Sequence, residues 1–169
     1  MTVRRHISAT ICFIILVSSA IVYAHPDSGL LPDAIAETEY KIVIDLNPDD
    51  IETRNRLGIV LYRKNKLKEA LEQFEAVLKV RPGDFNAHDG TGLVKMKQKQ
   101  YEDAVRWFKK AIALNEKDAM VHYHLGLAYK SLGDYDRAVR EFRKTLNIKH
   151  DREILKELNK LEQLSVEKR

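Results

Sequence analysis

Cysteine is almost absent from this chain of 169 residues: the single one, Cys12, lies in an apolar run near the N-terminus. A lone cysteine forms no internal disulfide and supplies neither a cysteine zinc site nor paired redox thiols. Glycine and proline are also scarce, with seven and four residues. So few turn-forming residues argue against a fold of many short strands, and we expect an all-α chain.

Motifs of catalysis are missing as well. The chain has no glycine loop for phosphate, no nucleophile elbow and no pair of histidines at zinc-binding spacing. His122 and His124 are two residues apart, so on a helix they point to different sides and do not chelate one ion. We therefore expect no enzyme activity, no cofactor and no metal site.

Long apolar runs are absent with one exception near the N-terminus. Residues 7–22 contain no charged side chain and follow Arg4 and Arg5, and small residues precede a possible cleavage point after Ala24. This pattern predicts an export signal. The run of about 16 residues is shorter than a typical spanning helix, and the alternative is an uncleaved anchor formed by residues 7–23. In both cases we expect the remainder outside the cytoplasm, in the periplasm or secreted.

A large excess of positive or negative charge is also lacking. Removal of residues 1–24 takes away Arg4 and Arg5 and no acid, so the net charge of +4 falls to +2. Such a balance does not indicate nucleic-acid binding. We expect membrane contact through the N-terminal segment alone, and only if it stays uncleaved.

What the chain does contain is a pattern that recurs every 34 residues. A small residue and an aromatic residue alternate in its second half, at Ala70 and Phe74, Ala104 and Phe108, Ala138 and Phe142. Its first half contains Leu57-Gly58, Thr91-Gly92 and Leu125-Gly126. A fixed period of this length predicts stacked pairs of helices. Because glycine disfavours a helix, its recurrence indicates close approach of the paired helix.

This pattern resembles the tetratricopeptide repeat (TPR) family, whose members place Leu-Gly, Tyr, Ala and Phe at set positions. Here these are Leu125, Gly126, Tyr129, Ala138 and Phe142. The resemblance implies a right-handed α-solenoid of antiparallel helix pairs. We divide the chain into a signal (1–24), a linker (25–32), a half-repeat helix (33–47), three full repeats (51–84, 85–118 and 119–152), a capping helix (153–164) and a tail (165–169).

Three details of the repeats carry further expectations. Val80, Leu114 and Ile148 are expected to close each unit as an aliphatic plug. Lys99 occupies the turn position of Gly133, and a left-handed conformation would cost lysine more than glycine, so we expect the second repeat to be the least stable. His88 and His122 replace the family's early tryptophan, which favours packing roles.

The resemblance also implies that the first helices line a concave groove. Its partner-binding positions in this chain would be Glu52, Asn55, Ile59, Tyr62 and Arg63; Asn86, Asp89, Leu93, Met96 and Lys97; and Met120, Tyr123, Leu127, Lys130 and Ser131. Apolar and amphipathic side chains there favour a protein or peptide ligand. The family's clamp for a C-terminal carboxylate is absent, since its positions hold Asn55, Ile59, Gly90, Met120 and His124.

The second repeat also gathers basic residues, at Lys95, Lys97, Lys99, Arg106, Lys109 and Lys110. A solvated face is favoured, because acids dilute the run, and an acidic partner or anionic lipid head groups are the alternative.

The leading hypothesis is an exported scaffold or assembly factor of a cell-envelope complex. The alternatives are a docking subunit in cytochrome c maturation and a structural protein that self-associates through the leucine stripe of residues 153–164.

Overall fold

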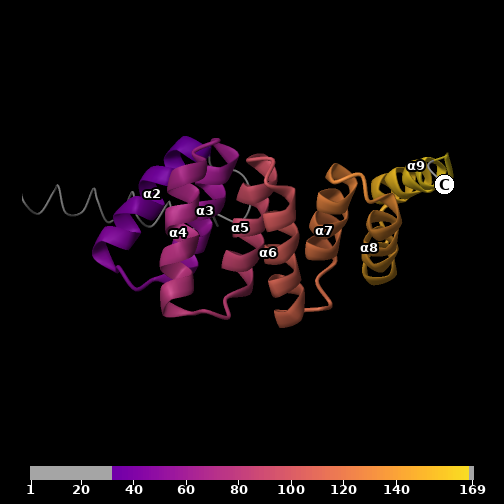
Figure 1. Cartoon of the computed structure of the whole chain (residues 1–169). Coiled ribbons are helices and arrows are strands. Elements are labelled where there is room, and N and C mark those ends of the chain that lie inside the picture. The colour runs from indigo at the N-terminus through magenta and orange to yellow at the C-terminus, as the bar shows by residue number, and fades with distance from the viewer. Residues whose placement is uncertain (1–31, 168–169) are drawn as a thin grey trace, which may run out of the picture.

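The computed structural model describes residues 32–167, and within them the chain forms eight helices and no strand. The helices are α2 (Asp33–Leu46), α3 (Ile51–Arg63), α4 (Leu67–Val80), α5 (Phe85–Lys97), α6 (Tyr101–Leu114), α7 (Ala119–Ser131), α8 (Tyr135–Ile148) and α9 (Arg152–Glu167). Figure 1 shows them side by side in chain order, from α2 at one end of the array to α9 at the other. The predicted all-α TPR solenoid is confirmed.

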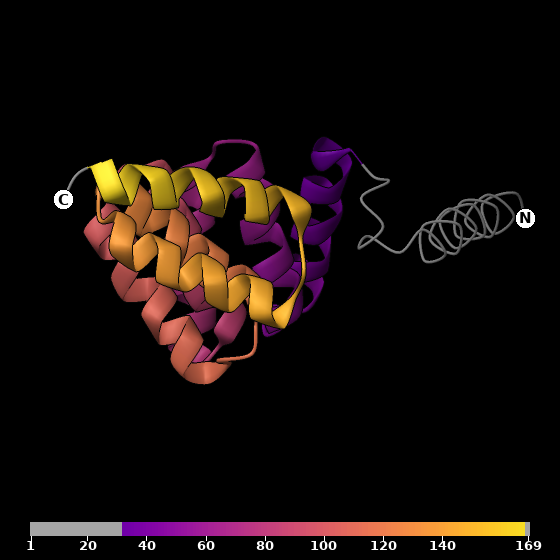
Figure 2. The same cartoon turned by 90° about the vertical axis from the view of Figure 1, so that its right-hand side faces the viewer.

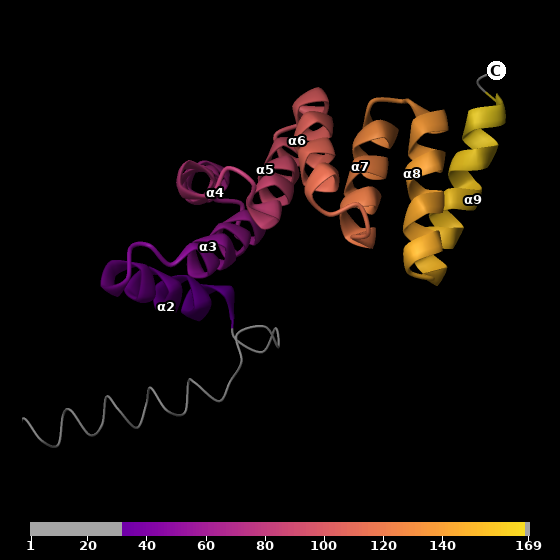
Figure 3. The ribbon, with the colours of Figure 1, turned by 90° about the horizontal axis from the view of Figure 1, so that it is seen from below.

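Neighbouring helices pack in antiparallel pairs, with α3 against α4, α5 against α6 and α7 against α8. Each second helix also packs on the first helix of the next repeat (Figure 3). The first helices α3 and α5 contact one another, as do α5 and α7, whereas no comparable contact joins α4 to α6 or α6 to α8 in the described part of the chain. The array therefore bends toward its first helices, which lie on the inner side.

The two end helices have different tasks. α2 packs on α3 as the second helix of an incomplete repeat, and α9 packs on α8 at the other end, as the end-on view in Figure 2 shows. In α9 the side chains of Leu158 and Leu161 are 6% and 0% exposed. Leu158 and Leu161 therefore pack within the same chain, where α9 contacts α8, whereas Leu155 of the same stripe is 37% exposed, and the self-association stays a prediction.

Local signals explain where the first helices begin. Each follows an aspartate, Asp50, Asp84 or Asp118, whose carboxylate accepts a hydrogen bond from a backbone N–H of the first turn. A carboxylate at this place satisfies an N–H group that has no partner inside the helix, and it faces the positive end of the helix dipole.

The turn inside each repeat needs one residue in the left-handed region. This residue is Asn65 with φ 62°, Lys99 with φ 61° and Gly133 with φ 75°. The left-handed turn expected at Lys99 is confirmed. The Cβ atom of lysine disfavours this region, so the turn of the second repeat is strained. Glycine has no Cβ atom, so the turn of the third repeat at Gly133 lacks this strain.

Each repeat is held by contact between a glycine and a phenylalanine. A Cβ atom on Gly126 would lie 2.4 Å from the ring of Phe142, which is fully buried. The same contact recurs in the other repeats, between Gly58 and Phe74 and between Gly92 and Phe108. The expected close approach of paired helices at glycine is confirmed, and any larger residue would meet the ring.

The aliphatic plugs expected at the ends of the second helices were wrong. Val80, Leu114 and Ile148 are 65%, 47% and 44% exposed. They are the last residues of α4, α6 and α8, where each helix gives way to the turn before the next helix. The core is formed instead by the interior alanines and phenylalanines of these helices.

Candidate partner-binding face

The predicted groove positions are carried by α3, α5 and α7, the helices on the inner side of the array. We call their outward side chains the first-helix face. Its centre is apolar and half-buried, formed by Ile59, Tyr62, Leu93, Met96, Tyr123 and Leu127. These side chains pack against the two core clusters beneath them and keep part of their surface exposed. Such a face exposes apolar surface to a partner, while packing on the core holds the same side chains in place.

Polar contacts connect the helices across this face. His124 of α7 contacts Asp89 of α5 through Nδ1, 2.9 Å from a carboxylate oxygen. Lys97 of α5 places its ammonium 4.5 Å from the centre of the Tyr62 ring of α3, and it donates a hydrogen bond to the Tyr62 carbonyl. Burial and then the negative charge of Asp89 raise the pKa of the Tyr62 hydroxyl. These contacts fix the spacing of neighbouring first helices.

At its two ends the first-helix face is joined to the end helices α2 and α9 by ion pairs. Arg63 donates to Asp33 of α2 at 3.0 and 2.6 Å, and this guanidinium lowers the pKa of the Asp33 carboxyl. At the other end, Lys130 forms an ion pair with Glu157 of α9. Arg63 and Lys130 were predicted to contact a partner, but both side chains are engaged within the chain. Their side chains remain 52% and 36% exposed, so partner contact through them stays a prediction.

Asn55 lies inside the molecule, where its side chain is 4% exposed. Its amide donates to Asp84 at 3.0 Å, and the same carboxylate oxygen accepts from the Ala87 N–H at the start of α5. Asn55 therefore joins α3 to the beginning of α5, and we leave it out of the accessible face.

The remaining predicted positions are on the surface. Met120 is 46% exposed and Asn86 is exposed beside it in the next repeat toward the N-terminus. Glu52 is exposed and accepts from Arg56 one turn later. The hydroxyl of Ser131 donates to the Leu127 carbonyl.

The residues that replace the family's early tryptophan share one structural role. Arg54, His88 and His122 each place a ring or guanidinium N–H against the carbonyl oxygen six residues earlier, at 3.0, 2.8 and 3.0 Å. The carbonyl belongs to the turn between two repeats. His88 and His122 are 8% and 4% exposed, which agrees with the packing role predicted for them.

A buried acid on α2 was missed at the sequence level. Glu37 is 6% exposed and accepts from Lys41, Lys64 and Lys66 at 2.6, 2.5 and 2.7 Å. The hydrogen bonds from Lys41, Lys64 and Lys66 lower the pKa of Glu37 to about 2, against the opposing effect of burial. The corresponding residues of later repeats are Leu71, Val105 and Val139. The signal was thus available, as an acid at an otherwise apolar position.

Among residues 32–167 no three His, Cys, Asp or Glu side chains are grouped closely enough for a metal ion. No described helix has both the length and the hydropathy needed to cross a membrane. The predicted export signal lies in residues 1–31, outside the described residues.

Comparisons with known proteins agree with this architecture. Models of the tetratricopeptide repeat match residues 51–81 and 119–151, and a model of the TPR repeat matches residues 92–133. Together these matches span more than half of the chain. No curated protein sequence matches it.

Several solved structures have a similar fold. MamA from Desulfovibrio magneticus RS-1, solved from residue 41 to its end, is 28% identical with a TM-score of 0.62, over 71% of this chain and 68% of that one. Another crystal structure of MamA is 24% identical with a TM-score of 0.61, over 78% of this chain and 88% of that one. A thermophilic TPR protein of Thermus thermophilus is 21% identical with a TM-score of 0.66, over 74% and 70%.

These proteins share the fold of stacked helix pairs with this chain, in which the glycine–phenylalanine contact recurs in all three pairs. The chain belongs to the tetratricopeptide repeat family.

Proposed function

We propose that this chain is exported and binds a protein or peptide segment on its first-helix face, as a scaffold or assembly factor of a cell-envelope complex. The observation that carries the proposal is the apolar row of Ile59, Leu93 and Leu127, one residue per repeat, on the inner side of the array. Apolar anchors at regular spacing suit an amphipathic helix or an extended segment.

The centre of the face is the region best suited to binding. At its two ends Arg63 and Lys130 form ion pairs with Asp33 and Glu157, and a segment that binds there would compete with these pairs. Aromatic and thioether side chains at Tyr62, Met96 and Tyr123 supply broad contact area there. The export part of the proposal rests on residues 1–24 and their signal-like pattern.

The experiment is crosslinking and capture from native envelope with the full chain. Leu93→Lys places a charge in the middle of the apolar row, and Met120→Lys places one in the first turn of α7, where the side chain is 46% exposed and a lysine costs the core little. Both variants should lose the captured partner, and circular dichroism checks that each variant remains helical. A matched control replaces Glu72 and Glu75 by alanine on the exposed side of α4. The binding proposal is rejected if folded Leu93→Lys and Met120→Lys proteins capture the same partner as the parent.

Export has its own measurement. N-terminal sequencing of the protein recovered from the envelope fraction should begin at His25. Recovery of the protein from the cytoplasmic fraction alone, starting at Met1, would contradict the export proposal and leave the binding proposal standing.

A further inference from the structure

The second helix of each full repeat ends with an exposed aliphatic residue. Val80 ends α4, Leu114 ends α6 and Ile148 ends α8, with 65%, 47% and 44% of each residue exposed. They are one repeat apart, so they form a row rather than a single apolar spot. We call this row and the cations beside it the second-helix edge.

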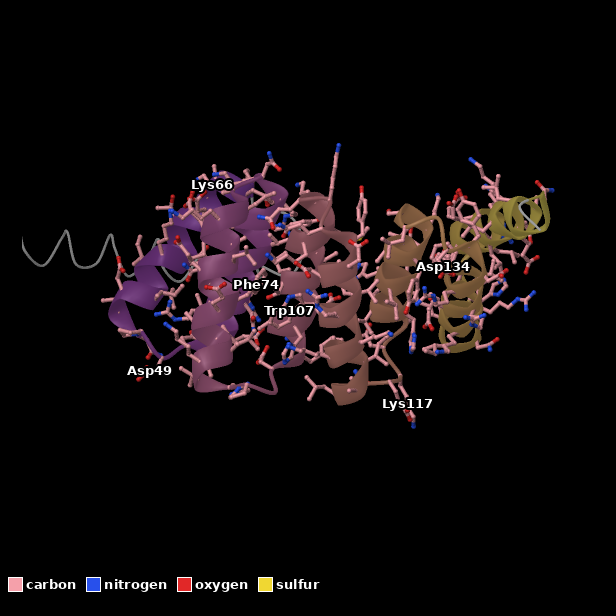
Figure 4. All side chains as sticks on the ribbon, viewed as in Figure 1. Asp49, Lys66, Phe74, Trp107, Lys117 and Asp134 are labelled. Carbon is pink, nitrogen blue, oxygen red and sulfur yellow. The ribbon has the colours of Figure 1, made fainter. Side chains whose placement is uncertain are left out.

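The row follows one border of the molecule, where the turns between repeats lie. Figure 4 shows Asp49 and Lys117, from two such turns, at the lower border, and Lys66, from a turn inside a repeat, at the upper border. Ile148 is at the far end of α8 from Leu132, which lies in the turn that precedes this helix. A helix of this length separates the two by about 20 Å.

Two cations lie within four residues of each aliphatic residue in the sequence, one before it and one after it. The pairs are Lys79 and Arg81 around Val80, Lys110 and Lys117 around Leu114, and Lys144 and Lys149 around Ile148. All six are exposed. The side chains of Lys79, Lys117 and Lys149 form no ion pair within the described residues. The other three are engaged within the chain: Arg81 pairs with Asp84, Lys144 pairs with Glu141, and the Lys110 ammonium lies 4.1 Å from the centre of the Trp107 ring.

Most acidic side chains of the same turns bind backbone groups. Asp84, Asp118 and Asp151 each accept hydrogen bonds from backbone N–H groups at the start of the following helix, and Asp84 also pairs with Arg81 at 3.4 Å. Glu116 remains as an exposed acid on this edge. The pattern of aliphatic residue and two cations begins with α4, because on α2 the exposed Leu46 has Asp45 and Asp49 beside it.

We propose that the second-helix edge binds the surface of an anionic lipid bilayer. The aliphatic ends of α4, α6 and α8 enter between the head groups, and the unpaired Lys79, Lys117 and Lys149 contact lipid phosphates. A bilayer supplies negative charge and apolar volume together along a line, as the edge requires. An acidic polypeptide is less suited, because it supplies negative charge without the apolar volume that the exposed Val80, Leu114 and Ile148 side chains require. The edge is separate from the first-helix face, so the failure of one proposal leaves the other untouched.

The first experiment measures sedimentation of the full chain with vesicles of phosphatidylcholine alone and of equimolar phosphatidylcholine and phosphatidylglycerol. The test variant combines Lys79→Gln, Lys117→Gln and Lys149→Gln. A matched control combines Lys68→Gln, Lys156→Gln and Lys160→Gln, which removes the same charge from exposed positions elsewhere. Parent and control should bind the anionic vesicles at least about tenfold more tightly than the test variant. Equal binding by all three, or no preference for phosphatidylglycerol, would overturn the proposal.

The second experiment separates this contact from any insertion by the N-terminal segment. An environment-sensitive fluorophore is attached at Ile148→Cys or, as control, at Leu132→Cys, each in a Cys12→Ser chain. Anionic vesicles should shift the emission to shorter wavelength at Ile148→Cys and leave it unchanged at Leu132→Cys. Equal shifts at both positions would refute the assignment to this edge. A response to poly-glutamate with none to vesicles would assign an acidic polypeptide instead and also overturn the proposal.

Discussion

The acid Glu37 provides a measurable test of how α2 is held on the array. Its carboxylate accepts from Lys41 on the same helix and from Lys64 and Lys66 in the turn between α3 and α4. A pKa lowered from 4.5 to about 2 corresponds to at most about 3 kcal/mol of stability. The lysine side chains are 28% to 48% exposed, so solvent screening reduces this to about 1–2 kcal/mol.

The sign follows from the direction of the shift. Because the folded-state pKa is below the unfolded value, the contribution is complete above pH 4.5 and is lost as the pH falls toward 2. Glu37→Gln should therefore destabilise the protein by about 1–2 kcal/mol at pH 7. The difference between parent and variant should narrow between pH 4.5 and 2.

Urea unfolding across this pH range measures the effect, and hydrogen exchange of the α2 amides shows whether the loss is local. Glu75→Gln is the matched control, since Glu75 is exposed on α4 with no partner among the described residues. Its free energy of unfolding should follow that of the parent at every pH. A parent–Glu37→Gln difference that stays constant down to pH 2 would refute the role assigned to this carboxylate.

Two further predictions concern the repeats. Gly126→Ala should destabilise the fold by about 1–3 kcal/mol, since the added Cβ atom meets the buried Phe142 ring; thermal unfolding measures this, and an unchanged melting temperature would contradict the close contact. Lys99→Gly should instead stabilise the second repeat by about 1 kcal/mol, because glycine adopts φ 61° without a Cβ penalty. Lys95→Gly, inside helix α5, is the control for the last prediction and should destabilise by about the same amount.

The repeat architecture could be read from the sequence because its signals are local and recur. Helix periodicity, the aspartates that begin first helices and the turn residue at Lys99 each depend on residues a few positions apart. The glycine–phenylalanine contact joins residues 16 apart, for example Gly126 and Phe142, and it was visible because three repeats show it. A second contact of Phe74, with Gly90 of the next repeat, occurs once and was missed.

The candidate face was predicted less completely. The apolar row of Ile59, Leu93 and Leu127 is half-buried on the first helices, where a partner could reach it. The side chains of Asn55 and Arg63 are engaged inside the chain. Neither engagement has a sequence pattern, since the Asn55 partner is Asp84 in the next repeat's helix cap and the Arg63 partner is Asp33 of α2.

Sequence alone thus determined the repeat, its helices and the family, since these depend on short-range conformational preferences that recur in each repeat. Tertiary structure decided which surfaces remain open. Arg63 and Lys130 form ion pairs with the end helices, and the packing of α9 on α8 buries Leu158 and Leu161. The same packing leaves Val80 and its equivalents exposed. Exposure depends on how far the neighbouring helix reaches along each element, and this distance is set by the packing of whole helices rather than by any one residue.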